Sequence, residues 1–348
     1  MLKRLSQRDR FELLIANFEP LIRSAFMDAI EDIKSNVQMR RIVERLEKND
    51  ISGAMDALHI DQAAFRPLDK AIADTFEGGG IAAVSGLPKF RDPDGNVLVI
   101  RFDVRHIGAE RWLSGQSAGL IPAITDDMRN AVRNALAAGM EAGNNPKTTA
   151  LDIVGRINRA TGRREGGILG LTEIQSQYVR NARLELLSGD PASLQSYLTR
   201  ARRDKRFDRT VLKAIQTGEK LPADTIVRML ARYEDSLLRQ RGDTIARTET
   251  LSALNASNHE AFRQGLENTG YTEQDVTRVW KTASDERVRH DHHLMGGVEV
   301  QGLNTPFTLP DGSQMMYPGD TSLGASAGQV IRCRCTQFIR LNFLKNID

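Results

Sequence analysis

The chain has 348 residues, more than one hydrophobic core usually supports, so we expect more than one structural unit. Its 48 Lys and Arg against 45 Asp and Glu leave a net charge of +3, and 40% of its residues are hydrophobic, which excludes wholesale disorder. Its apolar runs are far shorter than the roughly 20 residues of a membrane-spanning helix, so no transmembrane span is expected.

The N-terminal residues and the cysteines indicate the compartment. Charged residues begin at Lys3 and interrupt the apolar positions, so the continuous apolar segment of a signal peptide is missing. We therefore expect the protein to be kept in a cytoplasm-like compartment. Cys333 and Cys335 are the only two cysteines, and their one-residue separation does not suit a disulfide, which excludes a disulfide framework. Aromatic residues make up only 5%, which favours helical packing.

Residues 1–80 are predicted to form N-terminal helices. Apolar side chains recur at three- and four-residue steps from Phe11 to Ile30, with Pro20 as a kink or break. Two further helical patterns follow, at residues 39–46 and 61–76. The glycine run 78–80 is predicted to end the last of them, which puts a boundary near residue 80.

Residues 81–120 are predicted to be a small β-containing segment. Residues 92–96 (DPDGN) have turn chemistry, and residues 97–104 (VLVIRFDV) have the composition of a strand.

Residues 121–270 are predicted to be a helical body. Helix starts are indicated by Thr125 before two aspartates, by Pro146 after Asn145, and by a capping box from Thr172 to Gln175. Pro222 is predicted to open a long helix that reaches Asn268 or Gly270 as a single rod or as two helices interrupted near Gly242.

Residues 271–348 are predicted to form a small α+β module. Residues 276–282 read as a strand, residues 310–312 as a hairpin turn, and residues 329–341 as a terminal strand. The predicted fold class is therefore α+β and predominantly α-helical, with a long helical body followed by this C-terminal module.

The near-neutral charge hides a basic stretch. Residues 156–209 hold 12 basic against 6 acidic residues, a local charge of +6. Its densest piece has the composition of a nucleic-acid contact, and a solvated helix face is the alternative interpretation. The candidate contact residues are Arg200, Arg202, Arg203, Lys205, Arg206 and Arg209.

Histidine and cysteine gather in the C-terminal part. His290, His292 or His293 together with Cys333 and Cys335 could form a metal site, with zinc as the candidate ion. If residues 329–341 are a strand, both sulfurs point to one face. The alternative is that the cysteines are small apolar residues of a core strand.

Asp285 follows the strand of residues 276–282, and an ion pair with Arg287, Arg289 or Arg247 is favoured over a catalytic role. The sequence has no serine-triad motif, phosphate-binding glycine loop or HExxH pattern, so no catalytic residue is assigned.

Four motifs in order resemble the phage head morphogenesis family, the Mu F-like minor head proteins. They are residues 245–250 (IARTET), the run from Trp280 to Gly297, the hairpin 307–318 (FTLPDGSQMMYP), and residues 331–335 (IRCRC). The resemblance covers roughly residues 240–340.

The resemblance marks a set of signature positions. These are Arg247, Glu249, Trp280, Asp285, Arg289, His292, Gly297, Cys333 and Cys335. Some relatives have Cys-x-x-Cys where this chain has residues 289–292, which would complete a four-cysteine metal site. Arg289 cannot ligate zinc, so a site here would need His290 or His293 as a further ligand.

The resemblance implies a minor structural protein of a phage head, near the portal or in the capsid interior, in contact with the genome or ejected with it. The implied partners are portal protein, major capsid or scaffolding protein, and packaged DNA, and the implied location is the virion. No enzymatic activity and no obligatory cofactor are expected. The alternatives are a metal-dependent hydrolase or nuclease that uses His292, Asp285, Cys333 and Cys335, and a DNA-binding protein that acts outside the virion.

Overall fold

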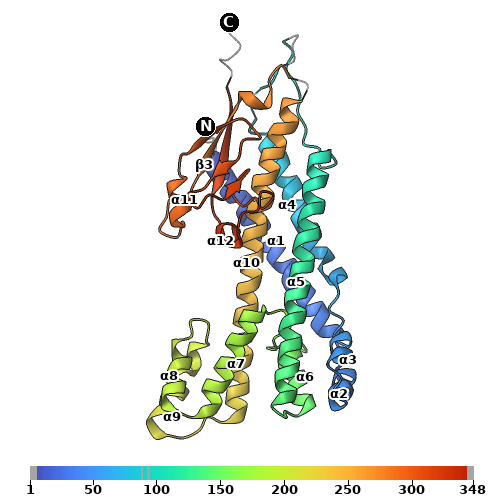
Figure 1. Ribbon diagram of the computed structural model, residues 1–348, viewed down its shortest axis with the longest axis vertical. Coiled ribbons are helices and arrows are strands. Elements are labelled where there is room, and N and C mark those ends of the chain that lie inside the picture. Colours follow the sequence, from blue (N-terminus) through green and yellow to red (C-terminus); the bar gives the residue numbers. More distant parts are fainter. Residues whose placement is uncertain (1–5, 88, 92–94, 268, 343–348) are drawn as a thin grey trace. The chain divides into compact units, whose positions relative to one another are not determined.

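The computed structural model describes residues 6–87, 89–91, 95–267 and 269–342. The fold is predominantly helical with small antiparallel sheets, and the predicted fold class is confirmed (Figure 1). None of the described helices is long and apolar enough to cross a membrane.

The helices are α1 (Gln7–Asn36), α2 (Met39–Glu47), α3 (Ile51–Asp56), α4 (Arg66–Val84), α5 (Ile107–Glu141), α6 (Pro146–Val154), α7 (Glu173–Ser188), α8 (Pro191–Thr199), α9 (Asp208–Thr217), α10 (Ala223–Leu266), α11 (His290–Leu294) and α12 (Ala327–Val330). The strands are β1 (Arg156–Ile157), β2 (Arg164–Glu165), β3 (Val276–Lys281), β4 (Glu299–Gln301), β5 (Phe307–Thr308), β6 (Gln314–Met315) and β7 (Thr336–Leu341).

The chain divides into two compact units. The first comprises residues 1–24, 68–118 and 244–348, and the second comprises residues 25–67 and 119–243. Helices α1, α4, α5 and α10 therefore each contribute residues to both units. The predicted ranges 1–80, 81–120, 121–270 and 271–348 stay a prediction.

The first unit contains the sheet that positions the candidate site. Strand β3 lies in the centre, antiparallel to β4 on one side and to β7 on the other, with Trp280 opposite Gln337. Strands β5 and β6 form a separate hairpin with Phe307 opposite Met315. In Figure 1 the sheet, α11 and α12 lie beside the C-terminal half of α10.

The second unit is mainly helical and holds a buried polar network. Lys34 Nζ donates to the carbonyl of Gly166 over 2.7 Å, and the amide of Gly167 donates to Glu234 over 2.6 Å. Gly166 and Gly167 have positive φ angles of 69° and 79°, which favour glycine because it has no Cβ. These contacts fix the chain after the β1–β2 hairpin to α1 and α10.

Helix starts with side-chain caps are where the sequence prediction was most accurate. Asn145 accepts from the amides of Lys147 and Thr148 with Pro146 in the first turn, and the capping box between Thr172 and Gln175 is present. Helix α10 begins directly after Pro222, as predicted, and continues through Gly242 without interruption.

Other predicted helix boundaries were wrong. The glycine run 78–80 lies inside α4 and does not end it. Glycine at position 79 allows α4 to approach α10 closely, because a Cβ there would lie only 2.4 Å from Ser257 Oγ. Thr125 lies inside α5, where its hydroxyl donates to the carbonyls of Ile121 and Pro122 instead of capping a helix start. Pro20 lies inside α1, so it does not break that helix, and the alternative of a kink stays a prediction.

Two strand predictions also need correction. Residues 97–104 contain no strand, and in this region the described backbone makes only an isolated bridge between Arg91 and Val97. The terminal strand begins at Thr336, because α12 occupies residues 327–330 and the chain turns at Arg332, which has a φ of 55°. The strand at residues 276–282 and the 307–318 hairpin were predicted correctly.

Candidate metal centre

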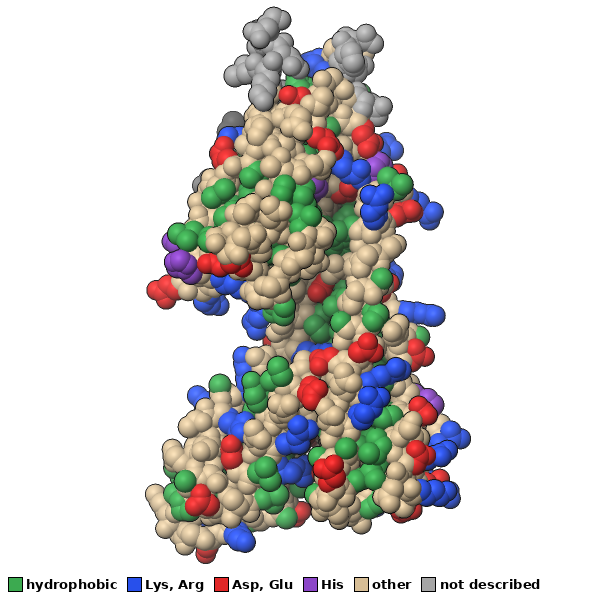
Figure 2. All heavy atoms as spheres, viewed as in Figure 1, with side chains coloured by type: hydrophobic (Ala, Val, Ile, Leu, Met, Phe, Trp, Pro, Cys, Tyr) green, Lys and Arg blue, Asp and Glu red, His purple; other side chains and the backbone are tan. Residues whose placement is uncertain are grey.

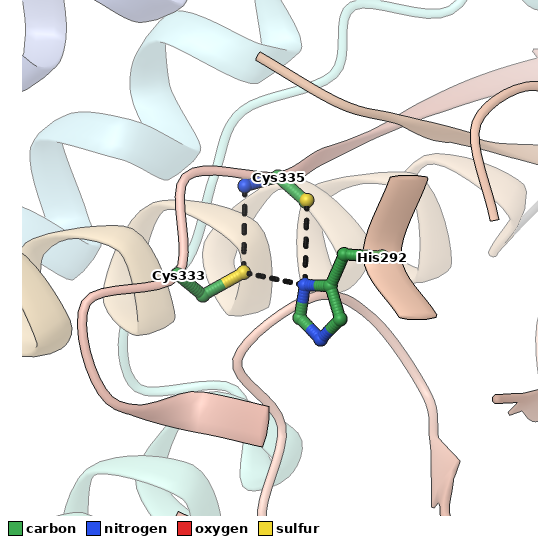
Figure 3. A group of neighbouring side chains, drawn as sticks. All are labelled: His292, Cys333 and Cys335. Atoms are coloured by element: carbon green, nitrogen blue, oxygen red, sulfur yellow. Dashed lines mark hydrogen bonds between the residues drawn. The ribbon is translucent and has the colours of Figure 1, made fainter. Parts of the chain in front are cut away.

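His292, Cys333 and Cys335 form a buried cluster in the first unit. His292 comes from α11, and the two cysteines lie between α12 and β7. Their side chains point toward one another (Figure 3), with His292 Nδ1 at 3.4 Å from Cys333 Sγ and 3.5 Å from Cys335 Sγ. The three potential ligand atoms lie within 4.8 Å of one another, and the residues are only 1%, 3% and 2% exposed.

The backbone places the two sulfurs together by a turn. Cys333 N–H donates to the carbonyl of Val330, and Cys335 N–H donates to Cys333 Sγ over 3.4 Å. Arg332 N–H donates to Thr248 Oγ1 of α10 over 3.0 Å, which holds the turn. The sulfurs are therefore neighbours, as predicted, but strand alternation is not the reason.

The walls of the cluster are apolar apart from the indole N–H of Trp280, which is buried and has no hydrogen-bond partner among the described residues. The two cysteines share a core cluster with Trp280, Phe307, Met295 and other buried residues. The Trp280 and His292 rings meet edge to face, with centroids 5.3 Å apart. His292 Nε2 is buried and has no hydrogen-bond partner among the described residues. Such surroundings suit a packed core and would also exclude water from a bound ion.

The two thiols differ in acidity. Hydrogen bonds from the Cys335 thiol and from His292 hold the pKa of Cys333 well below its usual value. The hydrogen bond to Cys333 and burial raise the pKa of Cys335. The lowered pKa of Cys333 favours its thiolate, which is the form of cysteine that binds metals.

The three donors fit a single metal ion. Around an ion with metal–sulfur and metal–nitrogen bonds of about 2.3 and 2.0 Å in tetrahedral directions, sulfur and nitrogen lie about 3.5 Å apart. The S···N distances of 3.4 and 3.5 Å match this spacing without rearrangement. His290 and His293 are exposed and are not in the cluster, so neither supplies the further ligand considered from the sequence.

Most of the other signature residues position the segments around the cluster. Asp285 is paired with Arg334, whose hydrogen bond lowers the pKa of Asp285 to about 2. Arg287 is a more distant partner at 3.8 Å. Arg289 donates to the carbonyl of Ile331. Gly297, with a φ of 88°, donates to the carbonyl of Trp280.

Arg247 and Glu249 lie on α10. Arg247 pairs with Glu19 over 3.1 Å, and the expected partnership of Asp285 with Arg247 is not found. Glu249 is buried and accepts a hydrogen bond from Gln116. Burial raises the pKa of Glu249 to about 7, and the Gln116 hydrogen bond opposes that shift.

A polar face of α10 that the sequence reading missed holds the C-terminal segments. Asn255 Nδ2 donates to the carbonyls of Pro318 and Cys335 over 2.9 and 3.1 Å, and its side-chain Oδ1 accepts from Gln337 N–H. Ser252 donates to the carbonyl of Gly319. The sequence contains a pattern that indicates this face, because Ser252 and Asn255 are three residues apart and therefore lie on the same side of a helix.

Arg278 of β3 is a second buried anchor that the sequence reading missed. It is 0% exposed, and its guanidinium donates to the carbonyls of Gly302, Thr305 and Met316. It also lies over the Phe307 ring, 5.0 Å from the centroid. The loop between β4 and β5 and the end of the β5–β6 hairpin are thereby attached to the central strand.

The basic stretch is partly neutralised by ion pairs. Arg200 pairs with Glu185, Arg203 with Asp208 and Arg206 with Asp204, at 2.7, 2.9 and 2.6 Å. Arg202, Lys205 and Arg209 are exposed and take part in no ion pair between described residues. On the face drawn in Figure 2, Lys and Arg side chains are interspersed with Asp and Glu.

These features define a predominantly helical protein with a small α+β module built around a buried Cys and His cluster. Residues 205–338 match the family described as Phage Mu protein F like protein, so this segment is Mu F-like and the resemblance is confirmed there. The segment is less than half of the 348 residues but includes every signature position. No curated protein and no solved structure matches the chain. The family supports a role in phage head morphogenesis.

Proposed function

We propose that this protein is a minor structural component of a phage head, located near the portal or in the capsid interior, with no enzymatic activity. The observation that carries the proposal is the Mu F-like match over residues 205–338. Its partners in this proposal are portal protein and major capsid or scaffolding protein. The buried anchors Asn255 and Arg278 support a structural role, because they fix the C-terminal segments to α10 and β3 as a rigid unit.

The alternative of a metal-dependent hydrolase has weaker support. A catalytic metal needs an open coordination position that substrate can reach. His292 and both cysteines are almost fully buried. A cavity of about 940 Å³ in the same unit is lined by Asp285, Arg334 and Trp280, and none of the three potential ligands lines it. Asp285 is also paired with Arg334.

A structural metal ion is the second part of the proposal. His292, Cys333 and Cys335 would hold the ion and tie α11 to the turn before β7. An ion held in this way would supply folding free energy and no chemical step.

Contact with the packaged genome is the third part. Arg202, Lys205 and Arg209 are the candidates with free charge, and exposed cations of this kind bind phosphate without reading sequence.

Fractionation of phage particles tests the head assignment. Gradient-purified particles should contain the protein in constant stoichiometry to the portal protein. Protease added outside should leave it intact until the capsid is opened. A protein that stays at the top of the gradient, or that is digested on intact particles, would refute the proposed location.

A further inference from the structure

Strand β7 lies at the edge of the sheet formed by β4, β3 and β7, so one side of its backbone faces away from β3. Gln337 N–H points to that free side, because it donates to Asn255 Oδ1 of α10. Backbone groups alternate in direction along an antiparallel strand. The N–H and C=O groups of Ile339 and Leu341 therefore also point away from β3.

A cavity of about 440 Å³ lies along this free side, and we call it the β7 edge cavity. It is lined by the consecutive residues 338–341 of β7. Because side chains alternate between the two faces of a strand, a cavity that reaches consecutive residues lies at the strand's edge and not over one face. The other walls come from α1, α4 and α10, including Phe11, Ala83 and Phe262.

The outward backbone groups have no other use in the described part of the chain. Asn255 of α10 satisfies the edge at Cys335 and Gln337. The outward N–H and C=O groups of Ile339 and Leu341 make no hydrogen bond with a described residue. A row of such groups is a template for a further strand.

The β7 edge cavity also contains a cation without a counter-charge. Arg10 of α1 lines the cavity, and its guanidinium takes part in no ion pair between described residues. Arg10 Nε is buried without a hydrogen-bond partner, and buried donors are nearly always paired. The second arginine of the lining, Arg340, is already paired with Glu299 over 2.7 Å. A carboxylate from outside would complete the contacts of Arg10.

We propose that the β7 edge cavity is the docking site of an extended, acidic segment of a partner protein, which adds to β7 as a strand and places an Asp or Glu side chain against Arg10. In such strand addition, main-chain hydrogen bonds give affinity and the surrounding pockets give specificity. A free anion would pair with Arg10 but leave the outward carbonyls of Ile339 and Leu341 without donors. The inference rests on the structural role proposed above and names how a partner of that role is bound.

Peptide binding to the full-length protein tests this. Short overlapping peptides that cover the portal, major capsid and scaffolding proteins of the same particle are screened by fluorescence anisotropy. We expect an acidic segment with apolar residues at alternate positions to bind, and replacement of its carboxylate by the amide should weaken binding about tenfold.

Methylation of the peptide's backbone nitrogens tests the strand geometry. Methyl groups on the alternate nitrogens that face β7 should weaken binding by at least about tenfold, because each removes a hydrogen bond and no side chain. The matched control is the same peptide with methyl groups on the intervening nitrogens, which should bind nearly as well as the parent. Equal effects of the two sets would overturn the proposal, and so would the absence of any binding peptide.

Variants of the protein test the cavity. Arg10→Glu should weaken binding of the acidic peptide by at least about tenfold, and Ala83→Trp, which fills the cavity, should abolish it. Arg111→Glu makes the same charge change at an exposed position of α5 in the same unit and should have little effect. Urea unfolding checks that each variant is folded.

Equal weakening by Arg10→Glu and Arg111→Glu would overturn the proposal. Self-association of the protein that Ala83→Trp abolishes would identify a second copy of the chain as the occupant and would also overturn it. Particle fractionation is independent of these measurements. A protein that is present in particles but binds no peptide refutes the docking site alone, so its failure and the failure of the head assignment are distinguishable.

Discussion

Glu249 is an acidic side chain kept inside the first unit, with Gln116 as its hydrogen-bond partner. Burial raises the pKa of Glu249 from 4.5 to about 7, so the folded state binds this proton more tightly than the unfolded state does. A raised carboxyl pKa stabilises the folded protein at low pH, and this stabilisation is lost as the pH rises from about 4.5 to about 7. The contribution amounts to about 3 kcal/mol.

Glu249→Gln should therefore flatten the pH dependence of stability. The free energy of unfolding, measured by urea titration from pH 4.5 to 7.5, should fall less steeply with rising pH in the variant than in the wild type. Glu286→Gln, which removes an exposed carboxylate in the same unit, should leave the slope unchanged. Identical slopes for wild type and Glu249→Gln would show that Glu249 does not bind the proton.

His292 and Cys333 allow packing and metal binding to be separated. His292→Ala and Cys333→Ser each disturb a fully packed position and should lower the free energy of unfolding by about 2 to 4 kcal/mol. His293→Ala, in the exposed neighbouring position, should change it by less than about 0.5 kcal/mol. If His292→Ala and Cys333→Ser lower the free energy of unfolding no more than His293→Ala does, neither the packed core nor the metal site describes the cluster.

A chelator then distinguishes the two interpretations. If an ion is held by the cluster, removing it from the wild-type protein should lower the melting temperature, and the chelator should have no effect on His292→Ala. Wild-type melting that is indifferent to both chelator and added metal would leave the cysteines as core residues.

At the scale of elements, the packing around Gly79 explains why α4 continues through the glycine run that was predicted to end it. Gly79→Ala adds a Cβ only 2.4 Å from Ser257 Oγ and 2.8 Å from Leu254 Cδ2, both buried on α10. It should destabilise the protein by about 1 to 3 kcal/mol, because overpacking outweighs the better helix propensity of alanine. Gly115→Ala in α5, where nothing lies within 4 Å, should instead stabilise by about 0.5 to 1 kcal/mol. Denaturant unfolding of the two variants measures both signs, and stabilisation by Gly79→Ala would contradict the close approach of α4 and α10.

The elements that could be predicted are those with local causes. The capping box at Thr172 and the proline before α10 act within one turn of their own helix, so the sequence pattern predicts them. A glycine run that ends a helix and one that lies inside a closely packed helix have the same sequence. In α4, only the residues of α10 that pack against Gly79 show that the helix continues.

The candidate site was predictable in composition and not in geometry. His292, Cys333 and Cys335 were selected from their chemistry, and they do lie together. The turn that joins the two sulfurs depends on the hydrogen bond from Arg332 N–H to Thr248 Oγ1. That contact spans 84 residues of chain, so no local pattern contains it.

At the scale of the whole molecule, we expect DNA binding to depend on the basic side chains that are not paired with carboxylates. Arg202, Lys205 and Arg209 have exposed charge, whereas Arg200, Arg203 and Arg206 are paired with carboxylates. Reversing the first three to Glu should weaken binding to duplex DNA and reduce the slope of log affinity against log salt by about 3, close to one per phosphate contact. Fluorescence anisotropy at several salt concentrations measures both quantities.

The matched control carries the same change of charge elsewhere in the same unit. Arg41, Lys48 and Arg66 are exposed residues of the second unit that take part in no ion pair between described residues, and their reversal to Glu should affect DNA affinity less. Equal losses in the two triple variants would indicate a general effect of net charge. DNA binding that is insensitive to salt would contradict an electrostatic interface.

The central claim is that the protein is a structural part of a phage head. Density maps of particles assembled with and without it test this claim most directly. We predict difference density at the portal vertex or on the inner capsid surface into which the module of β3, β4 and β7 with α11 fits. Identical maps, together with identical protein composition of the two particles, would contradict the account.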